Sequence, residues 1–395
     1  MSMLLDGVRV LDLSQMLAGP FGTMMLADLG AEVIKIETPG EGDRTRSMGP
    51  HFINGTSAYF ISINRNKKSI TINLKDDAGR QVFYDLVRRS DVVFDNFRPG
   101  VLERLKIDHE TLKTINPRII SVSISAYGTK GPYRDHPAFD LTIQALGGAM
   151  SYTGEPGRDP VRMGIPMGDL AGAMFAAYSV VSALYSREKN GTGCKIDVSL
   201  IDSLVALHTY VAQYYLFSGQ VPQPIGSAHQ SVVPYQAFRT KDIHIVIAVY
   251  TDKFWDLLCK ALDRKEFAGD PRFSDNEKRR ENRQALIQIL AETFKARPGA
   301  EWLERLNKEG VPCAPINTID MVAADPQVLM NGMIAELDIP GYGRLKTLGN
   351  PVKVRGMTEK YDAPPELGCQ TADILSGLLG YPKEKIDELK AKKAI

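Results

Sequence analysis

The chain has 395 residues, with 48 basic and 47 acidic side chains and a formal net charge of +1. At about 150 residues per domain, this length suggests two or three structural units. Hydrophobic residues make up 44% of the chain and charged residues 24%, which is typical of a soluble globular protein. The balanced charge gives no electrostatic basis for binding nucleic acid or an anionic membrane surface.

The four cysteines lie far apart and form no CxxC pair. Scattered cysteines in a chain of this length predict reduced, buried thiols in a cytosolic protein. The six histidines show no metal-ligand spacing, so we expect no metal site. The cysteines are Cys194, Cys259, Cys313 and Cys369.

Two stretches bear on targeting. The first residues do not resemble a secretory signal, because Asp6 and Arg9 fall where its apolar stretch would lie. The uncharged run at residues 170–186 is shorter than the about 20 apolar residues that a membrane span needs, and Gly172 dilutes it. We therefore expect a buried helix there, and a soluble, cytoplasmic protein with no membrane association.

Strand and helix patterns alternate through residues 1–130. This alternation implies an α/β fold, a doubly wound parallel sheet with helices on both faces. Ligands of such sheets bind beyond the carboxyl ends of the strands. The predicted strands are residues 8–13, 32–37, 69–74, 91–94 and 118–124, and the predicted helices are 21–29, 76–90 and 102–112.

The later part of the chain suggests a small domain inserted into the large one. Residues 221–226 are punctuated by Pro and Gly and look like a linker. We expect a large domain at 1–220, a smaller α+β domain at 226–330, and a return to the large domain with a C-terminal tail at 331–395. The further predicted elements are a hairpin-like stretch at 191–200, a strand at 244–249, helices at 254–262, 277–294 and from 302, strands joined by a turn in 341–354 and a polar helix at 382–394.

Motifs of several common chemistries are absent from the sequence. Residues 18–22, AGPFG, lack the GxGxxG spacing of a dinucleotide site. The chain has no GxxxxGK[ST] phosphate loop, no GxSxG nucleophile elbow and no HExxH helix. The candidate chemistry therefore rests on three loops.

The loops at residues 96–100 and 226–230 each allow two interpretations. The first follows a predicted strand ending at Asp95, where Arg98 and Arg104 could hold a phosphate, or could form a solvated basic face. The second lies at the expected domain junction and is either a linker turn or part of a site, with His229 more typical of a surface histidine.

The third loop contains Asp169, directly before the apolar run. The simplest interpretation is an N-cap aspartate that accepts backbone N–H groups. The helix dipole and amide donors favour the charged carboxylate, so we expect Asp169 to be ionised. The small residues 171–173 leave room for a substrate. A carboxylate here could attack an activated acyl group.

Taken together, these loops resemble the class III CoA-transferases, the family of formyl-CoA transferase and the carnitine CoA-transferases. The resemblance covers essentially the whole chain. The similar stretches, in the family's order, are residues 7–13 (GVRVLDL), 18–20 (AGP), 29–37 (LGAEVIKIE), 64–69 (NRNKKS), 96–100 (NFRPG), 168–172 (GDLAG) and 378–381 (LLGY).

The resemblance implies that Asp169 is the nucleophile. Its attack on an acyl-CoA thioester would give an anhydride, which CoA thiolate converts into an aspartyl-CoA thioester, and an acceptor carboxylate would then regenerate an acyl-CoA. Asp140 and Gln15 would support catalysis. The resemblance also implies a homodimer of interlocked rings, with acyl-CoA and a carboxylic acid as substrates and no permanently bound cofactor.

The resemblance further implies where CoA binds. Its contacts would come from loops of the large domain, and the active-site loop would contain Gly226, His229 and Gln230. The implied CoA contacts are Met16, Leu17, Ala18, Ile72, Asn73, Leu74, Lys75, Asn96, Phe97, Arg98 and Arg104.

The chain departs from formyl-CoA transferase, which has a glycine run over the active site, an arginine at the position of Thr38 and a lysine at that of Pro137. We therefore expect a different acyl donor, such as succinyl-CoA, and a CoA phosphate contact from another residue. The alternative is an α-methylacyl-CoA racemase of the same superfamily. A racemase has a histidine where this chain has Phe139, and His136 could replace it only if the loop differed. The presence of Asp169 disfavours a non-catalytic CoA-binding protein.

Overall fold

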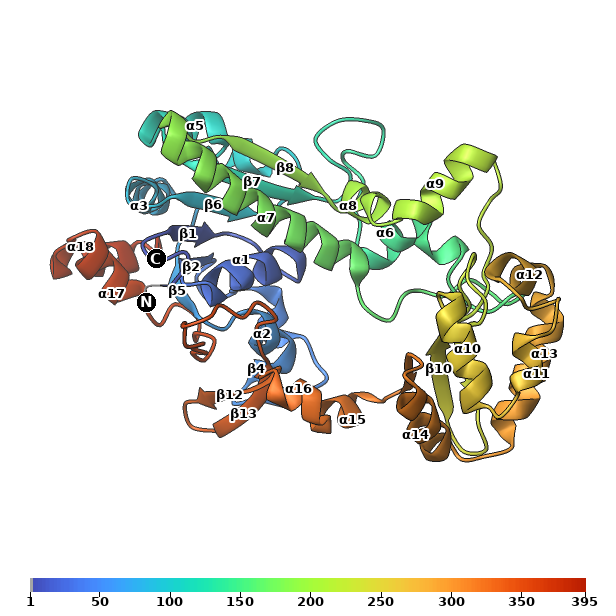
Figure 1. Cartoon of the computed structure of the whole chain (residues 1–395). Coiled ribbons are helices and arrows are strands. Elements are labelled where there is room, and N and C mark those ends of the chain that lie inside the picture. Colours follow the sequence, from blue (N-terminus) through green and yellow to red (C-terminus); the bar gives the residue numbers. More distant parts are fainter. Residues whose placement is uncertain (1–2) are drawn as a thin grey trace. The chain divides into compact units, whose positions relative to one another are not determined.

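The computed structural model describes residues 3–395, which divide into two compact units (Figure 1). The first unit contains the chain up to Ala149, together with Arg162–Phe217 and Gln327–Ile395. The second unit contains Met150–Val161 and Ser218–Pro326. The second unit is thus an insertion between parts of the first, and it includes a short segment from before the helix that carries Asp169.

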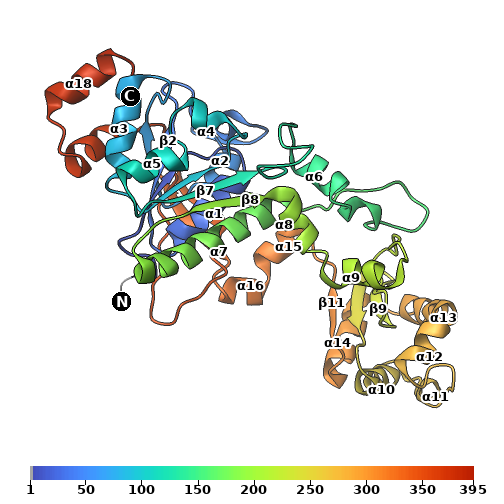
Figure 2. The same cartoon turned by 90° about the horizontal axis from the view of Figure 1, so that it is seen from above.

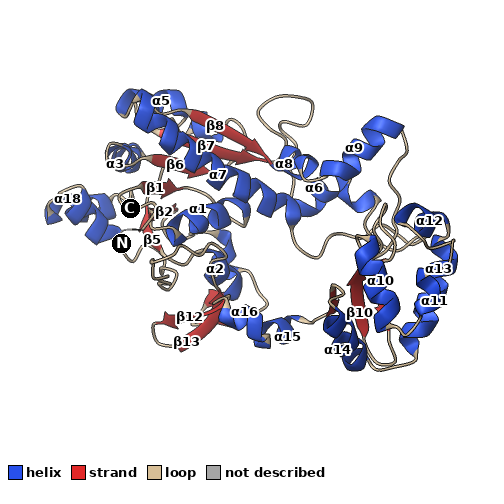
Figure 3. Cartoon of the chain, viewed as in Figure 1, coloured by secondary structure: helices blue, strands red, loops and turns tan. Residues whose placement is uncertain are grey.

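A six-stranded parallel sheet forms the centre of the first unit (Figure 3). The strand order is β5-β2-β1-β6-β7-β8, so the direction of winding reverses between β1 and β6. The sheet is covered on both faces, which is why all four residues of β6 are buried. The strands are β1 (Arg9–Asp12), β2 (Glu32–Glu37), β5 (Lys67–Thr71), β6 (Val92–Asp95), β7 (Ile120–Ser125) and β8 (Lys195–Ser199).

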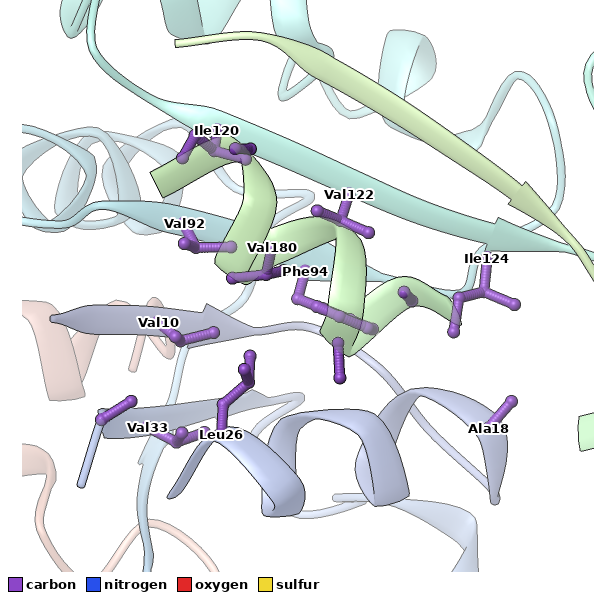
Figure 4. Close-up of a cluster of buried hydrophobic side chains, with 14 of the residues drawn as sticks. Val10, Ala18, Leu26, Val33, Val92, Phe94, Ile120, Val122, Ile124 and Val180 are labelled. Atoms are coloured by element: carbon purple, nitrogen blue, oxygen red, sulfur yellow. The ribbon is translucent and has the colours of Figure 1, made fainter. Parts of the chain in front are cut away.

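Helices pack on both faces of this sheet (Figure 2). On one face, α1 (Ala18–Asp28) and α7 (Met167–Asn190) lie over the strands, and Leu26 and Val180 share a core with Phe94 (Figure 4). On the other face, α3 (Asp77–Val87) and α5 (His109–Ile115) pack with the C-terminal α18 (Lys383–Ala391). The expected α/β fold with a parallel sheet is confirmed.

The remaining elements of the first unit lie in its loops and its returning C-terminal part. They are η1 (Arg44–Ser47), β3 (Phe52–Ile53), β4 (Thr56–Ser57), α2 (Ala58–Ile63), α4 (Val101–Arg104), α6 (Asp140–Leu146), α8 (Leu200–Ala206), α9 (Thr209–Ser218), β12 (Ile334–Ile339), β13 (Gly343–Leu348), α17 (Thr371–Asp373) and η3 (Ile374–Leu378); η2 (Ala149–Ser151) and α16 (Pro326–Met330) lie at the unit boundaries.

Helix α7 is the one helix in residues 3–395 that is long and apolar enough to cross a membrane. Half of its most apolar window is nevertheless buried within the protein, against α1 and the sheet. Tyr178 and Tyr185 on α7 are exposed. The expected buried helix is therefore buried on one side only.

The second unit is built on a three-stranded antiparallel sheet of order β11-β10-β9. Its core contains Trp255 and Trp302, both almost fully buried among aliphatic and aromatic side chains. The elements are β9 (Tyr235–Arg239), β10 (His244–Ala248), β11 (Cys313–Pro315), α10 (Asp252–Ala261), α11 (Lys265–Ala268), α12 (Asn276–Glu281), α13 (Arg283–Lys295), α14 (Gly299–Glu309) and α15 (Ile319–Ala324).

Several local predictions were wrong. The stretch at 191–200 is no hairpin, because β8 pairs in parallel with β7 as an edge strand of the large sheet. The helix predicted at 102–112 is two helices, separated where Lys106 has a positive φ and Asp108 caps α5. The helix predicted at 277–294 also breaks in two, at Asn282. The strands joined by a turn that were predicted in 341–354 are present as β12 and β13, but they lie earlier in the chain, from Ile334 to Leu348.

The cysteine prediction was partly wrong. All four thiols are free, but only Cys259 is buried, while Cys194 and Cys369 are exposed and Cys313 is partly exposed. Scattered spacing argues against disulfides, but it carries no information about burial. Among residues 3–395, no group of three or more His, Cys, Asp or Glu residues could hold a metal ion.

Candidate active site

A pocket of about 350 Å³ lies in the first unit, at the carboxyl ends of β1, β6, β7 and β8. This is the edge of the sheet where the winding reverses between β1 and β6, the usual ligand position of doubly wound sheets. The pocket is lined by Gln15, Met16, Leu17, Ala18, Arg44, Asn96, Phe97, Arg98, Pro99, Val101, Ile124, Ser125, Ala126, Arg134, His136, Ala138, Phe139, Asp169 and Leu200.

This lining brings together many residues that the sequence selected. Asp169 and Gln15 share the pocket with six of the implied CoA contacts, from the loops after β1 and β6. Sequence-distant loops meet here because parallel strands end at one edge of the sheet. The six contacts are Met16, Leu17, Ala18, Asn96, Phe97 and Arg98.

Asp169 lies in the first turn of α7, but it does not cap this helix. The N-cap residue is Pro166, and the helix amides are capped from α6, where Asp140 Oδ1 accepts the N–H groups of Gly168 at 2.8 Å and Asp169 at 3.3 Å. Among residues 3–395, no donor hydrogen-bonds to the Asp169 carboxylate. The expected N-cap role of Asp169 was therefore wrong.

The surroundings of Asp169 oppose its ionisation, contrary to the effect expected from the helix dipole and amide donors. Burial, followed by the negative charge of Asp140, raises the pKa of Asp169 from 3.8 to about 7. The amide donors expected to favour the charged form of Asp169 bond to Asp140 instead. A carboxylate with this pKa is more basic than an ordinary aspartate.

Asp140 is held firmly in its capping position. It is 9% exposed, and its Oδ2 accepts the side-chain N–H of the fully buried Gln144 at 2.6 Å. At Gly168, a Cβ atom would lie 2.9 Å from Ile143 Cγ2 and 3.1 Å from Asp140 Oδ1. Glycine at 168 therefore allows α6 to approach α7 closely enough for the capping hydrogen bonds.

Tyr59 is a residue near the site that the sequence analysis missed. It lies on α2, and burial together with the charges of Asp169, Asp43 and Asp140 raises the pKa of Tyr59 to about 12. Tyr59 is not among the residues that line the pocket, and it is linked to the site through the charge of Asp169. No motif marks Tyr59, because its nearness to Asp169 arises only in the fold.

Three arginines line the pocket: Arg44, Arg98 and Arg134. Only Arg98 was predicted. Among the described residues, Arg44 and Arg98 have no carboxylate within ion-pair distance, and Arg134 has only the neighbouring Asp135 at 3.7 Å. Unpaired guanidinium groups suit phosphate or carboxylate ligands. Arg44, six residues after Thr38, is a candidate for the phosphate contact that Thr38 cannot make.

Other implied CoA contacts do not line this pocket. Ile72 is buried in the core beneath α3, and Leu74 packs against the same core. Asn73 and Lys75 belong to the turn between β5 and α3, where Asn73 N–H donates to Ala394 O. Arg104 is exposed at the end of α4, the helix that follows Arg98.

Gly226, His229 and Gln230 belong to the second unit, where their loop is anchored by hydrogen bonds. Gly226 N–H donates to Gly154 O, and the Arg283 guanidinium donates to the carbonyl oxygens of His229 and Gln230 at 2.9 and 2.8 Å. The His229 ring accepts the N–H of Ser231 through Nδ1. The loop is thus more ordered than a free linker turn.

Phe139 and His136 bear on the racemase alternative. Both line the pocket with Asp169. Phe139 is 71% exposed at the N-cap of α6, and its ring has no group that transfers a proton. His136 lies beside Tyr133, with ring centroids 5.4 Å apart. The pocket therefore contains a histidine, but not at the position that a racemase uses.

Comparisons with known proteins cover almost the whole chain. Residues 5–371 match CoA-transferase family III. The chain is 40% identical over 386 residues to the succinyl-CoA:glutarate CoA-transferase of Homo sapiens, covering 98% of this chain and 88% of that protein. It is 40% identical over 372 residues to the acetyl-CoA:oxalate CoA-transferase of Acetobacter aceti, covering 93% and 94%. The crystal structure of a CAIB/BAIF family protein from Brucella suis has a TM-score of 0.85 at 38% identity, covering 96% of this chain and all of that one.

Proposed function

The chain belongs to CoA-transferase family III, and from this premise we propose that Asp169 is the nucleophile through which it moves CoA from a short acyl-CoA to a free carboxylic acid. The observation that carries the proposal is the state of Asp169. It is a partly buried carboxylate without a hydrogen-bond donor, with a pKa of about 7, in a pocket with unpaired arginines. Such a carboxylate is poorly solvated and basic, which favours attack on a thioester.

The proposed reaction has four balanced steps. The Asp169 carboxylate attacks the thioester carbonyl, and CoA thiolate leaves an acyl-aspartyl anhydride. The thiolate then attacks the Asp169 carbonyl carbon, which releases the donor acid and forms an aspartyl-CoA thioester. The acceptor carboxylate displaces CoA to form a second anhydride. CoA finally attacks the acyl carbonyl of this anhydride, which regenerates the Asp169 carboxylate and yields the new acyl-CoA.

Succinyl-CoA is our first candidate for the acyl donor. The human relative is named for succinyl-CoA and glutarate, and the relative from Acetobacter aceti is named for acetyl-CoA and oxalate. The acceptors in both names are dicarboxylic acids. Arg44, Arg98 and Arg134 give the pocket the positive charge that a dicarboxylate and the CoA phosphates both need.

We also propose that the protein acts as a homodimer of interlocked rings. The second unit interrupts the first in sequence, which the threading of one protomer through another requires. Helices α7 and α9 expose apolar side chains, with Tyr178 70% and Phe217 91% exposed. Large exposed apolar patches are typical of interfaces, and a second copy would cover them.

The experiment that tests the catalytic proposal combines turnover with trapping. Succinyl-CoA is incubated with isotope-labelled glutarate, oxalate or other carboxylic acids, and labelled thioester is detected by mass spectrometry. Hydroxylamine added during turnover should modify the peptide that contains Asp169. The Asp169→Asn variant should fold and lose both transfer and modification. Full transferase activity in this variant would refute the nucleophile assignment.

A further inference from the structure

The segment at residues 14–16, between β1 and α1, is held in an unusual way. Gln15 and Met16 of this segment line the pocket, yet the backbone groups of the segment are bound by side chains rather than by other backbone groups. Asp12 Oδ1 accepts the N–H of Ser14 at 2.9 Å. Asn96 Oδ1 accepts the N–H of Gln15 at 2.9 Å, and Asn96 Nδ2 donates to Gln15 O at 2.6 Å. These bonds fix the segment against the loop after β6.

Two further bonds come from a buried ion pair. Lys35 Nζ donates to Ser14 O at 2.7 Å and lies 2.9 Å from Asp43 Oδ2. Asp43 Oδ1 accepts the N–H of Met16 at 3.4 Å. The side chains of Lys35 and Asp43 are both fully buried. The ion pair therefore binds the segment at two points, the carbonyl oxygen of Ser14 and the N–H of Met16.

Met16 has a backbone conformation that needs this support. Its φ is +67°, in the left-handed region that residues other than glycine, asparagine and aspartate rarely adopt. Such conformations cost free energy and persist only where the surroundings enforce them. At Gly19, a Cβ atom would lie 2.2 Å from Ser14 Cβ, so the segment also packs closely against the start of α1.

The ion pair belongs to a larger buried network. Lys67 Nζ lies 3.0 Å from Asp12 Oδ2 and donates to Pro20 O at 2.9 Å. The side chains of Lys67 and Asp12 are fully buried. Lys35 and Lys67 come from the stretches 29–37 and 64–69, which carry the family resemblance but take no part in the proposed chemistry. Buried ion pairs are seldom the most stabilising choice, because desolvation offsets their attraction. A role in fixing one backbone arrangement would explain their presence.

We propose that Lys35 and Asp43 are positioning residues, which hold Met16 in its left-handed conformation so that the pocket wall formed by residues 15–18 faces Asp169 in the geometry that acyl transfer needs. The proposal rests on the function proposed for Asp169, and it adds a role for residues that do not line the pocket. A shift of about 1 Å in a wall that orients the thioester can lower the rate about 100-fold.

The test compares two buried ion pairs at opposite ends of α1. Asp43→Asn keeps an oxygen that can accept from Met16 N–H but removes the charge that pairs with Lys35. Asp28→Asn makes the same change in the Asp28–Arg65 pair, whose closest atoms are 2.6 Å apart and whose side chains are each 4% exposed. Asp28 is the last residue of α1 and does not line the pocket. It is therefore a matched control for the loss of a buried charge.

Three readouts separate positioning from general destabilisation. Amide hydrogen exchange of residues 14–17 should be faster in Asp43→Asn than in the wild type, and unchanged in Asp28→Asn. For the acyl-transfer reaction, kcat should fall about tenfold or more in Asp43→Asn with a smaller change in KM, whereas Asp28→Asn should stay within about twofold. Thermal unfolding should report a similar loss of Tm in both variants.

A rescue experiment tests the backbone conformation itself. In the Asp43→Asn background, Met16→Gly should give a higher kcat than Met16→Ala, because glycine adopts a positive φ without steric strain. Both changes remove the same pocket-lining side chain, so their difference isolates the backbone.

Equal kinetic losses in Asp43→Asn and Asp28→Asn, unchanged exchange at residues 14–17, or equal activity of the two Met16 double variants would overturn the positioning role. Wild-type protein that transfers CoA to no acid would count against the proposed function instead. In that case, faster exchange of the 14–17 amides in Asp43→Asn would still show that the ion pair holds this backbone segment. Lys35→Met, which removes the other charge of the pair and leaves the Asp43 oxygens in place, provides a second variant if Asp43→Asn does not fold.

Discussion

Asp140 accepts a hydrogen bond from the backbone N–H of Asp169, and in doing so takes the capping role that Asp169 was expected to have. The Asp140 carboxylate therefore accepts hydrogen bonds from the start of α7, whereas the Asp169 carboxylate lines the pocket. The negative charge of Asp140 adds to burial in raising the pKa of Asp169 to about 7. Two carboxylates with different surroundings thus acquire different tasks.

The first prediction concerns the pH dependence of transfer. Only ionised Asp169 attacks, so kcat/KM should rise with pH and level off above an apparent pKa of about 7. Asp140→Asn removes a nearby negative charge but keeps an oxygen for the amides of Gly168 and Asp169. The rise of kcat/KM should therefore occur at lower pH, although burial keeps its apparent pKa above the ordinary value of 3.8. Initial rates measured across pH 4–9 check this, with Asp28→Asn as the control, and an unchanged or raised limb in Asp140→Asn would contradict it.

The second prediction concerns stability. The pKa of Asp169 is raised from 3.8 to about 7 on folding, so the native state binds the proton more tightly than the unfolded state does. The free energy of unfolding should therefore fall as pH rises through this window, and the loss should be complete above about pH 7. Asp169→Asn removes the titrating group, so its Tm should exceed that of the wild type by a few degrees at pH 8 and match it near pH 4.

Calorimetry or circular dichroism at the two pH values measures this difference. Asp6→Asn, at an exposed site, is the control for the loss of one negative charge. A lower Tm for Asp169→Asn than for the wild type at pH 8 would contradict this prediction. It would mean that the charged carboxylate stabilises the fold, although burial and the charge of Asp140 disfavour the charged form.

The sequence predicted the parallel sheet well, because continuous apolar strands and amphipathic helices leave a local pattern. It also located Asp169, through the Gly-Asp-Leu-Ala-Gly stretch at the start of an apolar run. The resemblance named Asp140 as catalytic support, but its capping role could not be predicted, since Asp140 lies 29 residues earlier in the chain and reaches Asp169 only through the packing of α6 on α7.

The alternation of charged and apolar residues in β2 predicted the strand correctly, but it does not predict the burial of the charged residues. It suggests a strand with one solvated face, yet Lys35 is 0% and Glu37 is 5% exposed. Both faces of the sheet are covered, so these charges are compensated by partners from other segments: Asp43 for Lys35 and Arg46 for Glu37. Hydropathy patterns describe solvation, and they cannot anticipate a buried ion pair whose members meet only after folding.

The third prediction concerns the dimer. Interlocked protomers cannot separate without unfolding, so dissociation and denaturation should coincide at every protein concentration. Sedimentation and circular dichroism in increasing urea should give superimposable transitions. Charged substitutions on the exposed faces of α7 and α9, such as Tyr178→Glu and Phe217→Glu, should prevent accumulation of folded protein rather than yield a monomer. A folded, active monomer on dilution would rule out interlocking.

The last prediction separates CoA transfer from racemisation. A racemase needs two proton-transfer groups beside the acidic carbon next to the thioester. In this pocket Asp169 could supply one, but Phe139 has neither a lone pair nor an exchangeable proton. Transfer needs no proton at that carbon, because attack takes place at the carbonyl. An α-methylacyl-CoA incubated with the protein in deuterated buffer should therefore keep its α-hydrogen, as mass spectrometry would show.

Under the same conditions, a labelled carboxylic acid that the protein accepts should appear as its CoA thioester. His136→Gln tests the remaining route to proton transfer, since His136 is the one histidine that lines this first-unit pocket. If the protein is a transferase, neither the wild type nor His136→Gln should incorporate deuterium. Rapid incorporation in the wild type that is lost in both Asp169→Asn and His136→Gln would instead identify these two residues as a proton-transfer pair, and the racemase alternative would replace the transferase.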